Sequence, residues 1–200
     1  MTVTPLLPDK ETYGCSSYLV MGEWKRLEDI NTLIDAGGND RIVAQIEAIP
    51  TGVGKKGVER VILTHSHFDH MGGLAAIIDR YHPEVLAFSM VRGVTRVLRN
   101  GERLRCGSGT LEVIHVPGHS QDSICLLDSQ QGILFTGDMP LRVYTAGGSY
   151  TRPYAEAIER FAGLALKTIC PGHGLPIEEN IDVILRKSLA NLRKCTLVDG

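Results

Sequence analysis

The stretch RVILTHSHFDHMGG, residues 60–73, decides the fold of this chain. Its opening is a β-branched, apolar run, which predicts a buried strand over residues 60–64. The closing glycines lead into residues 74–79, where a helix is expected. The segment between them carries four potential metal ligands, which are His65, His67, Asp69 and His70. Because a strand end can open into a tight loop, all four side chains can be directed into one space.

The spacing of these four side chains favours a shared site. His65 and His67 are two residues apart, so on extended backbone they project to the same side. Asp69 and His70 follow after one spacer, where the chain must turn toward the helix. Imidazole nitrogen and carboxylate oxygen are the ligands expected at zinc or iron sites. A single histidine is usually an ordinary core or surface residue, but this cluster predicts a metal site.

Three later segments repeat one device, in which a strand ends in a glycine turn that presents a polar residue. The segments are residues 116–119, 135–138 and 170–173, and the polar residues are His119, Asp138 and His173. Loops at strand ends are where rigid scaffolds present functional groups. The two remaining histidines are interpreted as structural: His82 precedes Pro83 at an expected helix end, and His115 alternates with apolar residues in a strand.

The composition is that of an ordinary globular protein, with a hydrophobic fraction of 43% and a formal net charge of -2. A charge this small gives no global attraction to nucleic acid or to an anionic membrane. No apolar run approaches the ~20 residues that span a bilayer, and residues 1–10 lack the features of a signal peptide. The cysteines lack Cys-x-x-Cys spacing, which favours reduced thiols. We therefore expect a cytoplasmic protein with no nucleic-acid or membrane partner.

Strands and helices recur in both halves of the chain. Strands are expected at residues 18–21, 31–35, 60–64, 85–88, 111–116, 123–127, 132–136 and 168–170, and helices at 40–49, 74–79, 154–166 and 181–195. This alternation predicts an α/β domain with helices outside two sheets. The glycine-rich loop at residues 52–57 lacks phosphate-loop spacing and is interpreted as a connector, or as a flap near the site.

The ordered set of motifs resembles the metallo-β-lactamase superfamily. The pattern His65-x-His67-x-Asp69-His70 is followed in order by His119, Asp138 and His173. Asp35, within residues 33–37, resembles the first motif of that superfamily. The Pro-Gly-His-Ser, Thr-Gly-Asp and Pro-Gly-His-Gly phrases are most similar to the glyoxalase II-like hydrolase branch. The resemblance implies a four-layer αββα sandwich, built as a single domain of two similar halves over residues 1–200.

The resemblance also implies a dinuclear site with two divalent metal ions, zinc being expected and iron or manganese being alternatives. The first ion would be held by His65, His67 and His119, the second by Asp69, His70 and His173, and both by Asp138. Asp35 would orient the histidine loop without touching metal. Asp69 and Asp138 are the expected catalytic residues.

The implied activity is hydrolysis of a small-molecule thioester, ester or lactone by a metal-bridging hydroxide. The absence of a Gly-x-Ser-x-Gly elbow agrees with a mechanism that needs no serine nucleophile. Little sequence follows His173, so the glutathione-gripping region of glyoxalase II is not expected. Further candidates for binding a carboxylate or an oxyanion are Arg142, Tyr144, Tyr150 and Arg152.

Two other activities share these motifs. A mononuclear-iron sulfur dioxygenase would hold one iron with the positions of His65, His119 and Asp138, so the metal count discriminates it from a hydrolase. A tRNA-processing-type phosphodiesterase shares the histidine run, although the net charge of -2 argues against RNA binding. The oligomeric state is open, with a homodimer as one option.

Overall fold

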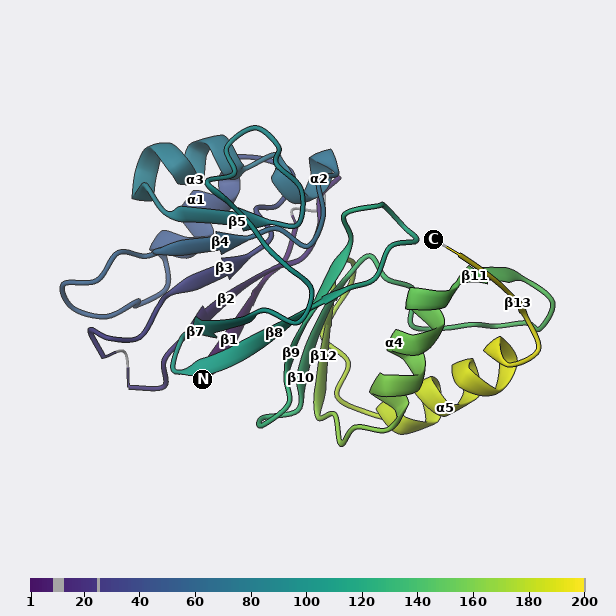
Figure 1. Ribbon diagram of the computed structural model, residues 1–200. Helices are drawn as coiled ribbons and strands as arrows, with labels where there is room; N and C mark the ends of the chain where they lie inside the picture. The colour runs from purple at the N-terminus through teal and green to yellow at the C-terminus, as the bar shows by residue number, and fades with distance from the viewer. Residues whose placement is uncertain (9–12, 25, 200) are drawn as a thin grey trace.

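Two β-sheets packed face to face, with helices on both outer sides, form the protein (Figure 1). The computed structural model describes residues 1–8, 13–24 and 26–199. Its buried side chains fall into three hydrophobic clusters, one between the sheets and one beneath each helical layer. The predicted αββα sandwich is therefore confirmed.

The first sheet has six strands in the order β1-β2-β3-β4-β5-β6. They are β1 (Thr2–Leu6), β2 (Ser17–Met21), β3 (Thr32–Ile34), β4 (Arg60–Ile62), β5 (Glu84–Ala87) and β6 (Arg96–Val97). Pairing is antiparallel from β1 to β3 and parallel from β3 to β6. The helices α1 (Arg41–Glu47) and α3 (Leu74–Tyr81) cover its outer face, as Figure 1 shows. Ile46 and Ile77 on these helices share one hydrophobic cluster with Val61 of β4.

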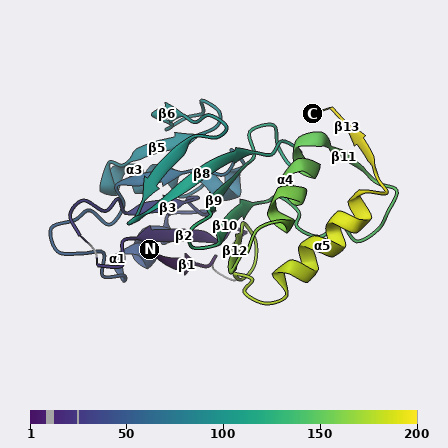
Figure 2. The same cartoon turned by 60° about the horizontal axis from the view of Figure 1, so that its bottom comes forward.

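The second sheet has five strands in the order β12-β10-β9-β8-β7. They are β7 (Arg103–Cys106), β8 (Gly109–His115), β9 (Ile124–Asp128), β10 (Ile133–Gly137) and β12 (Thr168–Pro171). β9 and β10, which match the strands expected at residues 123–127 and 132–136, pair as an antiparallel hairpin. Helices α4 (Arg152–Ala162) and α5 (Ile181–Leu192) cover this sheet, and the short strands β11 (Ser149–Thr151) and β13 (Thr196–Val198) pair beside them (Figure 2).

Side chains alternate between the two faces of a strand, so one sheet contributes to both the outer and the inner hydrophobic cluster. Val61 packs with the helices, whereas its neighbour Ile62 belongs to the cluster between the sheets. In that inner cluster the rings of Tyr18 and Phe135, one from each sheet, lie 5.5 Å apart in an edge-to-face arrangement. Burying a side chain of this size stabilises the fold by about 1.5–3 kcal/mol. The apolar run of β4 was therefore correctly interpreted as a buried strand, and the structure shows that both of its faces are covered.

The elements that the sequence does not predict lie mostly at the edges of the sheets. They are the strands β1, β6, β7, β11 and β13 and the short helix α2 (Phe68–Met71). β1 contains Pro5, which weakens a strand prediction but is tolerated on an edge strand. Helix α4 starts two residues earlier than predicted, because Thr151 Oγ1 accepts a hydrogen bond from the N–H of Tyr154. It also ends earlier than predicted, with Gly163 as its C-cap.

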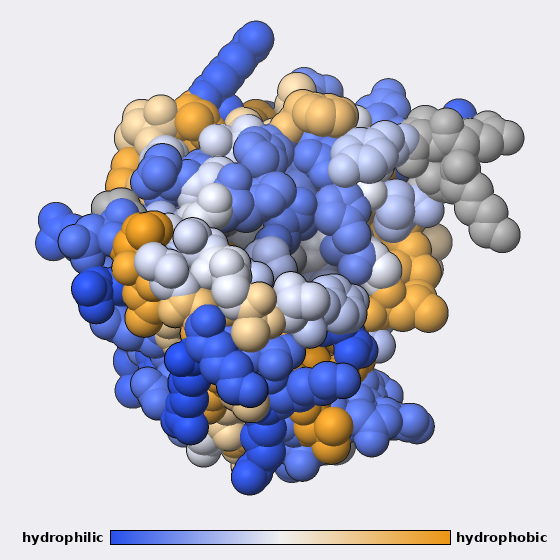
Figure 3. Space-filling view, turned by 90° about the vertical axis from the view of Figure 1, so that its right-hand side faces the viewer, coloured by the Kyte–Doolittle hydropathy of each residue, from blue (hydrophilic) through white to orange (hydrophobic). Residues whose placement is uncertain are grey.

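The helices α4 and α5 present a mostly polar outer surface (Figure 3). The side of the molecule that carries α4, α5, β11 and β13 is mostly hydrophilic in Figure 3, with hydrophobic groups in small, separate patches. This matches helices that bury one apolar face, such as Ile158 and Phe161 of α4, against the sheet. Among the residues that the structure describes, no helix is both long enough and apolar enough to cross a membrane.

The loops that carry the motif residues gather at one edge of the sandwich. β3 and β4 are parallel, as are β10 and β12, so the carboxyl ends within each pair meet at the same edge. The N–H of Ile124 donates to the carbonyl of Thr64 at 2.8 Å and joins the two sheets there. The loop at residues 52–57 precedes β4 and lies at the opposite edge, where Lys55 Nζ donates to the carbonyl of Asp29. The interpretation of this loop as a flap near the site is therefore wrong.

Candidate metal centre

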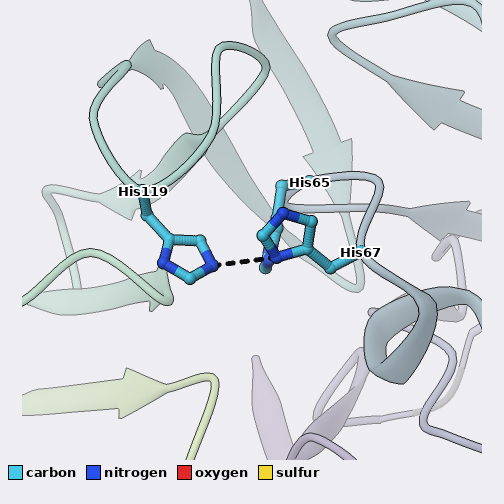
Figure 4. Close-up of side chains that lie close together, drawn as sticks. All are labelled: His65, His67 and His119. Carbon is cyan, nitrogen blue, oxygen red and sulfur yellow. Dashed lines mark hydrogen bonds between the residues drawn. The ribbon is translucent and has the colours of Figure 1, made fainter.

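Three histidines from two loops converge at the motif edge: His65, His67 and His119 (Figure 4). Each offers a ring nitrogen, and these three nitrogens lie within 4.8 Å of one another. His119 Nε2 lies 3.0 Å from His67 Nδ1. His65 is buried, whereas His67 and His119 are exposed, so the group is open to solvent on one side. We call these residues the histidine cluster.

A second group, the mixed cluster, consists of Asp69, His70, Asp138 and His173. One ligand atom from each lies within 4.8 Å of the others. Asp69 Oδ2 is 3.2 Å from His173 Nε2 and 3.7 Å from His70 Nε2. Asp69 and His70 are buried, while His173 is exposed. The mixed cluster is therefore enclosed at Asp69 and His70 and open to solvent at His173.

The carboxylate of Asp138 lies between the two clusters. Its Oδ2 atom is 3.4 Å from His119 Nε2 and 3.3 Å from His173 Nε2. Its Oδ1 atom is 3.1 Å from His70 Nε2. One side chain at the end of β10 thus contacts both groups of donors. The structure therefore brings together all seven residues named from the sequence, while neither His82 nor His115 is part of a group in the described ranges.

The turn of the histidine loop is made by α2. His67 is its N-cap with extended backbone, so the side chains of His65 and His67 leave a non-helical segment while Asp69 and His70 lie on a helical turn. The glycines that follow are required by close packing. A Cβ on Gly72 would overlap the carbonyl oxygen of Gly38, and one on Gly73 would overlap neighbouring carbonyls. The Gly-Gly pair therefore lets the loop approach the main chain that follows β3.

Asp35 contacts both ends of the histidine loop, residues 64–70. Its Oδ1 accepts a hydrogen bond from the N–H of Thr64 at 2.7 Å, and its Oδ2 accepts one from Thr64 Oγ1 at 2.8 Å. The same Oδ2 lies 2.8 Å from His70 Nδ1. Asp35 is 2% exposed and has a φ of 59°, a left-handed conformation that aspartate tolerates better than most residues. Because the Asp35 carboxylate contacts His70 Nδ1, the other ring nitrogen, Nε2, faces the remaining members of the mixed cluster.

Burial and neighbouring charges shift the pKa values of three residues in the clusters. Burial is the largest influence on His65 and lowers its pKa to about 4, so the ring is neutral at neutral pH. Burial acts in the same direction on His70, but the carboxylates of Asp35 and Asp138 outweigh it and raise its pKa. Burial opposes ionisation of Asp138, but the neighbouring His70 outweighs it and lowers the pKa to about 2. The field at His70 therefore favours positive charge.

Three buried atoms test whether the clusters fit metal ions. Among the described residues, His65 Nε2, His70 Nε2 and Asp138 Oδ1 make no hydrogen bond of good geometry, although His70 Nε2 and Asp138 Oδ1 are only 3.1 Å apart. Leaving a buried polar group unpaired costs about 1–3 kcal/mol. Coordination to a cation would satisfy all three atoms, which belong to the two clusters. The donors are imidazole nitrogens and carboxylate oxygens, which suit zinc, iron or manganese. The residues therefore fit divalent metal ions.

A segment that the sequence analysis missed joins the loops of the site. The N–H of Cys15 donates to the carbonyl of Asp69 at 3.2 Å, and the N–H of Ser16 donates to the carbonyl of Gly172 at 2.7 Å. Ser16 Oγ donates to the carbonyl of Gly174 at 2.8 Å. The Cys15 thiol also lies near Asp35 and His70, and its burial raises its pKa. No sequence pattern marks this segment, because most of these bonds use its main chain.

The predicted helpers after Asp138 are partly engaged elsewhere. Thr151 Oγ1 donates to the carbonyl of Pro117, so β11 lies beside the His119 loop. Arg152 forms an ion pair with Asp199 at 2.7 Å. Tyr150 stacks on Tyr154 with 5.1 Å between ring centroids. Arg142 and Tyr144 are exposed. Roles for these four candidates in binding an oxyanion stay predictions.

Gly172 supplies the first prediction, because a side chain there would enter the mixed cluster. An added Cβ would overlap Asp138 Oδ1 and would lie 2.9 Å from His70 Cε1. We expect Gly172→Ala to lower kcat/KM about 100-fold, since misplacing a reacting group by ~1 Å can cost that much. Steady-state kinetics and metal analysis measure this. Gly163→Ala, whose Cβ would lie 3.4 Å from the carbonyl oxygen of Arg160, is the control. Equal activity in the two variants would contradict the prediction.

Comparison with known proteins identifies a family. The sequence model described as the metallo-beta-lactamase superfamily matches residues 12–91 and 86–173. A protein named atrochrysone carboxyl ACP thioesterase from Aspergillus fumigatus is 28% identical, over 82% of this chain and 52% of its own length. Lactamase-like protein adaB from Aspergillus niger is 30% identical, over 83% of this chain and 51% of its own length. The chain thus spans about half the length of the curated relatives it matches.

Solved structures share the fold at low sequence identity. The BLEG-1 B3 metallo-beta-lactamase has a TM-score of 0.67 and 18% identity, covering 94% of this chain and 97% of its own. ETHE1 from Myxococcus xanthus has a TM-score of 0.68 and 21% identity, covering 96% of this chain and 91% of its own. At these identities the likeness shows the fold alone.

Proposed function

Because the chain belongs to the metallo-β-lactamase superfamily, we propose that it is a dinuclear metal-dependent hydrolase that cleaves thioesters. The observation that carries this proposal is the position of Asp138, whose carboxylate contacts donors of both clusters. The unpaired buried atoms around it support cation binding. The thioesterase names of several relatives support the choice of substrate.

The ligands divide between two ions of the same charge. The histidine cluster of His65, His67 and His119 would hold the first ion, and Asp69, His70 and His173 would hold the second. Asp138, whose oxygens lie beside donors of both clusters, would contribute to both. Zinc is the proposed metal, and iron or manganese would suit the same donors. Asp35 keeps the His70 ring oriented through Nδ1.

The residues around the ions have distinct tasks. When bound, a pair of such metals supplies hydroxide at neutral pH, since one zinc alone lowers the pKa of water from ~15.7 to about 7. The exposed His67, His119 and His173 leave this centre open to a substrate from solvent. Asp69 is assigned to receive, at Oδ2, the proton that the reaction releases. That oxygen lies 3.2 Å from His173 Nε2, at the border of the open side.

The open centre suits a small-molecule acyl group that remains attached to a larger thiol. Three of the proposed ligands are exposed, so the scissile carbonyl can reach the centre without the whole substrate being enclosed. A thioester is also the group in the names of several relatives. Lactones and oxygen esters are the alternatives that a substrate panel separates.

The test is metal analysis of freshly purified protein together with a panel of thioesters, lactones and phosphodiesters. We expect two zinc ions per chain and thioester hydrolysis. A chelator should remove the metal and reduce the rate by at least about 1000-fold, and added zinc should restore it. The elution volume of the protein should stay the same, which controls for unfolding.

Two results would contradict the proposal. One iron per chain with oxygen consumption on a sulfur substrate would favour the mononuclear-iron dioxygenase. Turnover of phosphodiesters but of no thioester would favour the tRNA-processing type of activity. Two metals per chain with thioester turnover excludes both.

A further inference from the structure

Two exposed aromatic rings border the mixed cluster. Tyr13 and Phe68 are each 70% exposed, and their ring centroids lie 5.9 Å apart with an angle of 32° between the planes. The Tyr13 ring also lies 5.7 Å from the His173 ring, at 36°. We call the two residues the aromatic pair. Adjacent exposed rings of this size leave apolar surface in water, which is unfavourable unless a ligand covers it.

The aromatic pair is held in place by the same main chain that builds the centre. Phe68 is the first residue of α2 and stands between His67 and Asp69, both proposed ligands. Tyr13 precedes the segment whose Cys15 N–H donates to the Asp69 carbonyl. The main chain that carries both rings is therefore tied to the loops of the proposed ligands, so the rings lie beside the centre.

We propose that the aromatic pair binds a flat, conjugated acyl group of the substrate while its thioester carbonyl lies at the metal centre. This inference rests on the proposed thioester hydrolysis and adds the class of acyl group. An aromatic ring stacks favourably on tilted or offset rings, beyond the effect of the area it buries. A saturated ring of equal size buries similar area but lacks this stacking.

Aromatic rings can bind either cations or neutral flat groups, and the positive charge of the proposed metal ions favours the neutral ones. Aromatic faces also attract cations. The proposed metal ions would repel a cationic group placed beside His173, whereas a neutral conjugated acyl group carries no such penalty. A neutral, flat acyl group is therefore the occupant that suits both the rings and the centre.

The test compares benzoyl and cyclohexanecarbonyl thioesters of the same thiol, with metal-loaded protein. We expect the wild-type protein to prefer the benzoyl thioester, with the preference residing in KM. Phe68→Ala and Tyr13→Ala should each lower the ratio of the two kcat/KM values about fivefold to tenfold. Phe68→Tyr, which keeps an aromatic ring, should keep the wild-type ratio of the two kcat/KM values. Trp24→Ala is the matched control, since Trp24 is 76% exposed but follows β2 at the opposite edge of the sheet.

Measuring the metal content of each variant distinguishes loss of the aromatic pair from loss of the bound metal ions. Phe68 lies between two proposed ligands in the sequence, so Phe68→Ala could also lose metal. Tyr13→Ala changes no residue next to a proposed ligand in the sequence. If Phe68→Ala loses metal, the result for Tyr13→Ala decides whether the aromatic pair binds the acyl group. A benzoyl preference that survives Tyr13→Ala at full metal content would overturn this inference alone. A wild-type protein that hydrolyses no thioester would overturn the proposed function and this inference with it.

Discussion

Asp138→Ala is expected to abolish hydrolysis, with kcat/KM falling by about 1000-fold or more. The reason is its position, because its two oxygens lie 3.1–3.4 Å from ring nitrogens of His70, His119 and His173, which belong to both clusters. Removing it also leaves His70 without one of its three nearby carboxylates, the others being Asp35 and Asp69. Steady-state kinetics and metal analysis by mass spectrometry measure both effects.

The metal content of a second variant tests whether two ions are involved. His67→Ala removes one member of the histidine cluster and leaves Asp69, His70, Asp138 and His173 unchanged. We expect it to retain about one ion per chain and to be inactive. Asp138→Ala should retain less. Asp79→Ala, an exposed aspartate of α3, is the control and should keep wild-type activity. Retained turnover in both ligand variants would end the assignment.

Replacing Asp35 is expected to have the largest effect on stability. Asp35→Ala would leave the Thr64 N–H and His70 Nδ1 without their buried acceptor and would place alanine at a φ of 59°. We expect a loss of about 3–5 kcal/mol in the free energy of unfolding, as for other buried ionic networks with one partner removed. Metal affinity should fall about 10-fold to 100-fold. Chemical denaturation and competition with a chromophoric chelator measure these quantities.

Asp35→Asn separates charge from shape, since asparagine also tolerates the left-handed conformation. We expect it to lose metal affinity while losing less stability than the alanine variant. Asp128→Asn is the matched control, because Asp128 is also 2% exposed and accepts the N–H groups of Gln130 and Gln131 in the β9–β10 turn. It should lower stability without changing metal affinity. If it changed metal affinity as much as Asp35→Asn, a specific role for Asp35 would be refuted.

The fold was predictable where the hydrophobic pattern is strong. The run at residues 60–64 and the hairpin over residues 123–136 fall where the structure has β4, β9 and β10. The edge strands were not predicted, because two or three residues in an exposed strand leave no clear periodicity. All three residues of β13, for example, are exposed, and the strand is defined by its pairing with β11. Such strands depend on a partner that the local sequence does not specify.

The sequence by itself determined which residues could bind metal and the order in which they occur, since ligand chemistry is a property of residue type. It also placed each one at a strand end, because hydrophobic periodicity and glycine turns are local signals. The resemblance assigned Asp138 to both ions, but only the tertiary structure decided how close its oxygens lie to the two clusters, and that Tyr13 packs beside Phe68 and His173. These contacts join residues far apart in the chain, so they depend on how the sheets pair and pack rather than on any local pattern.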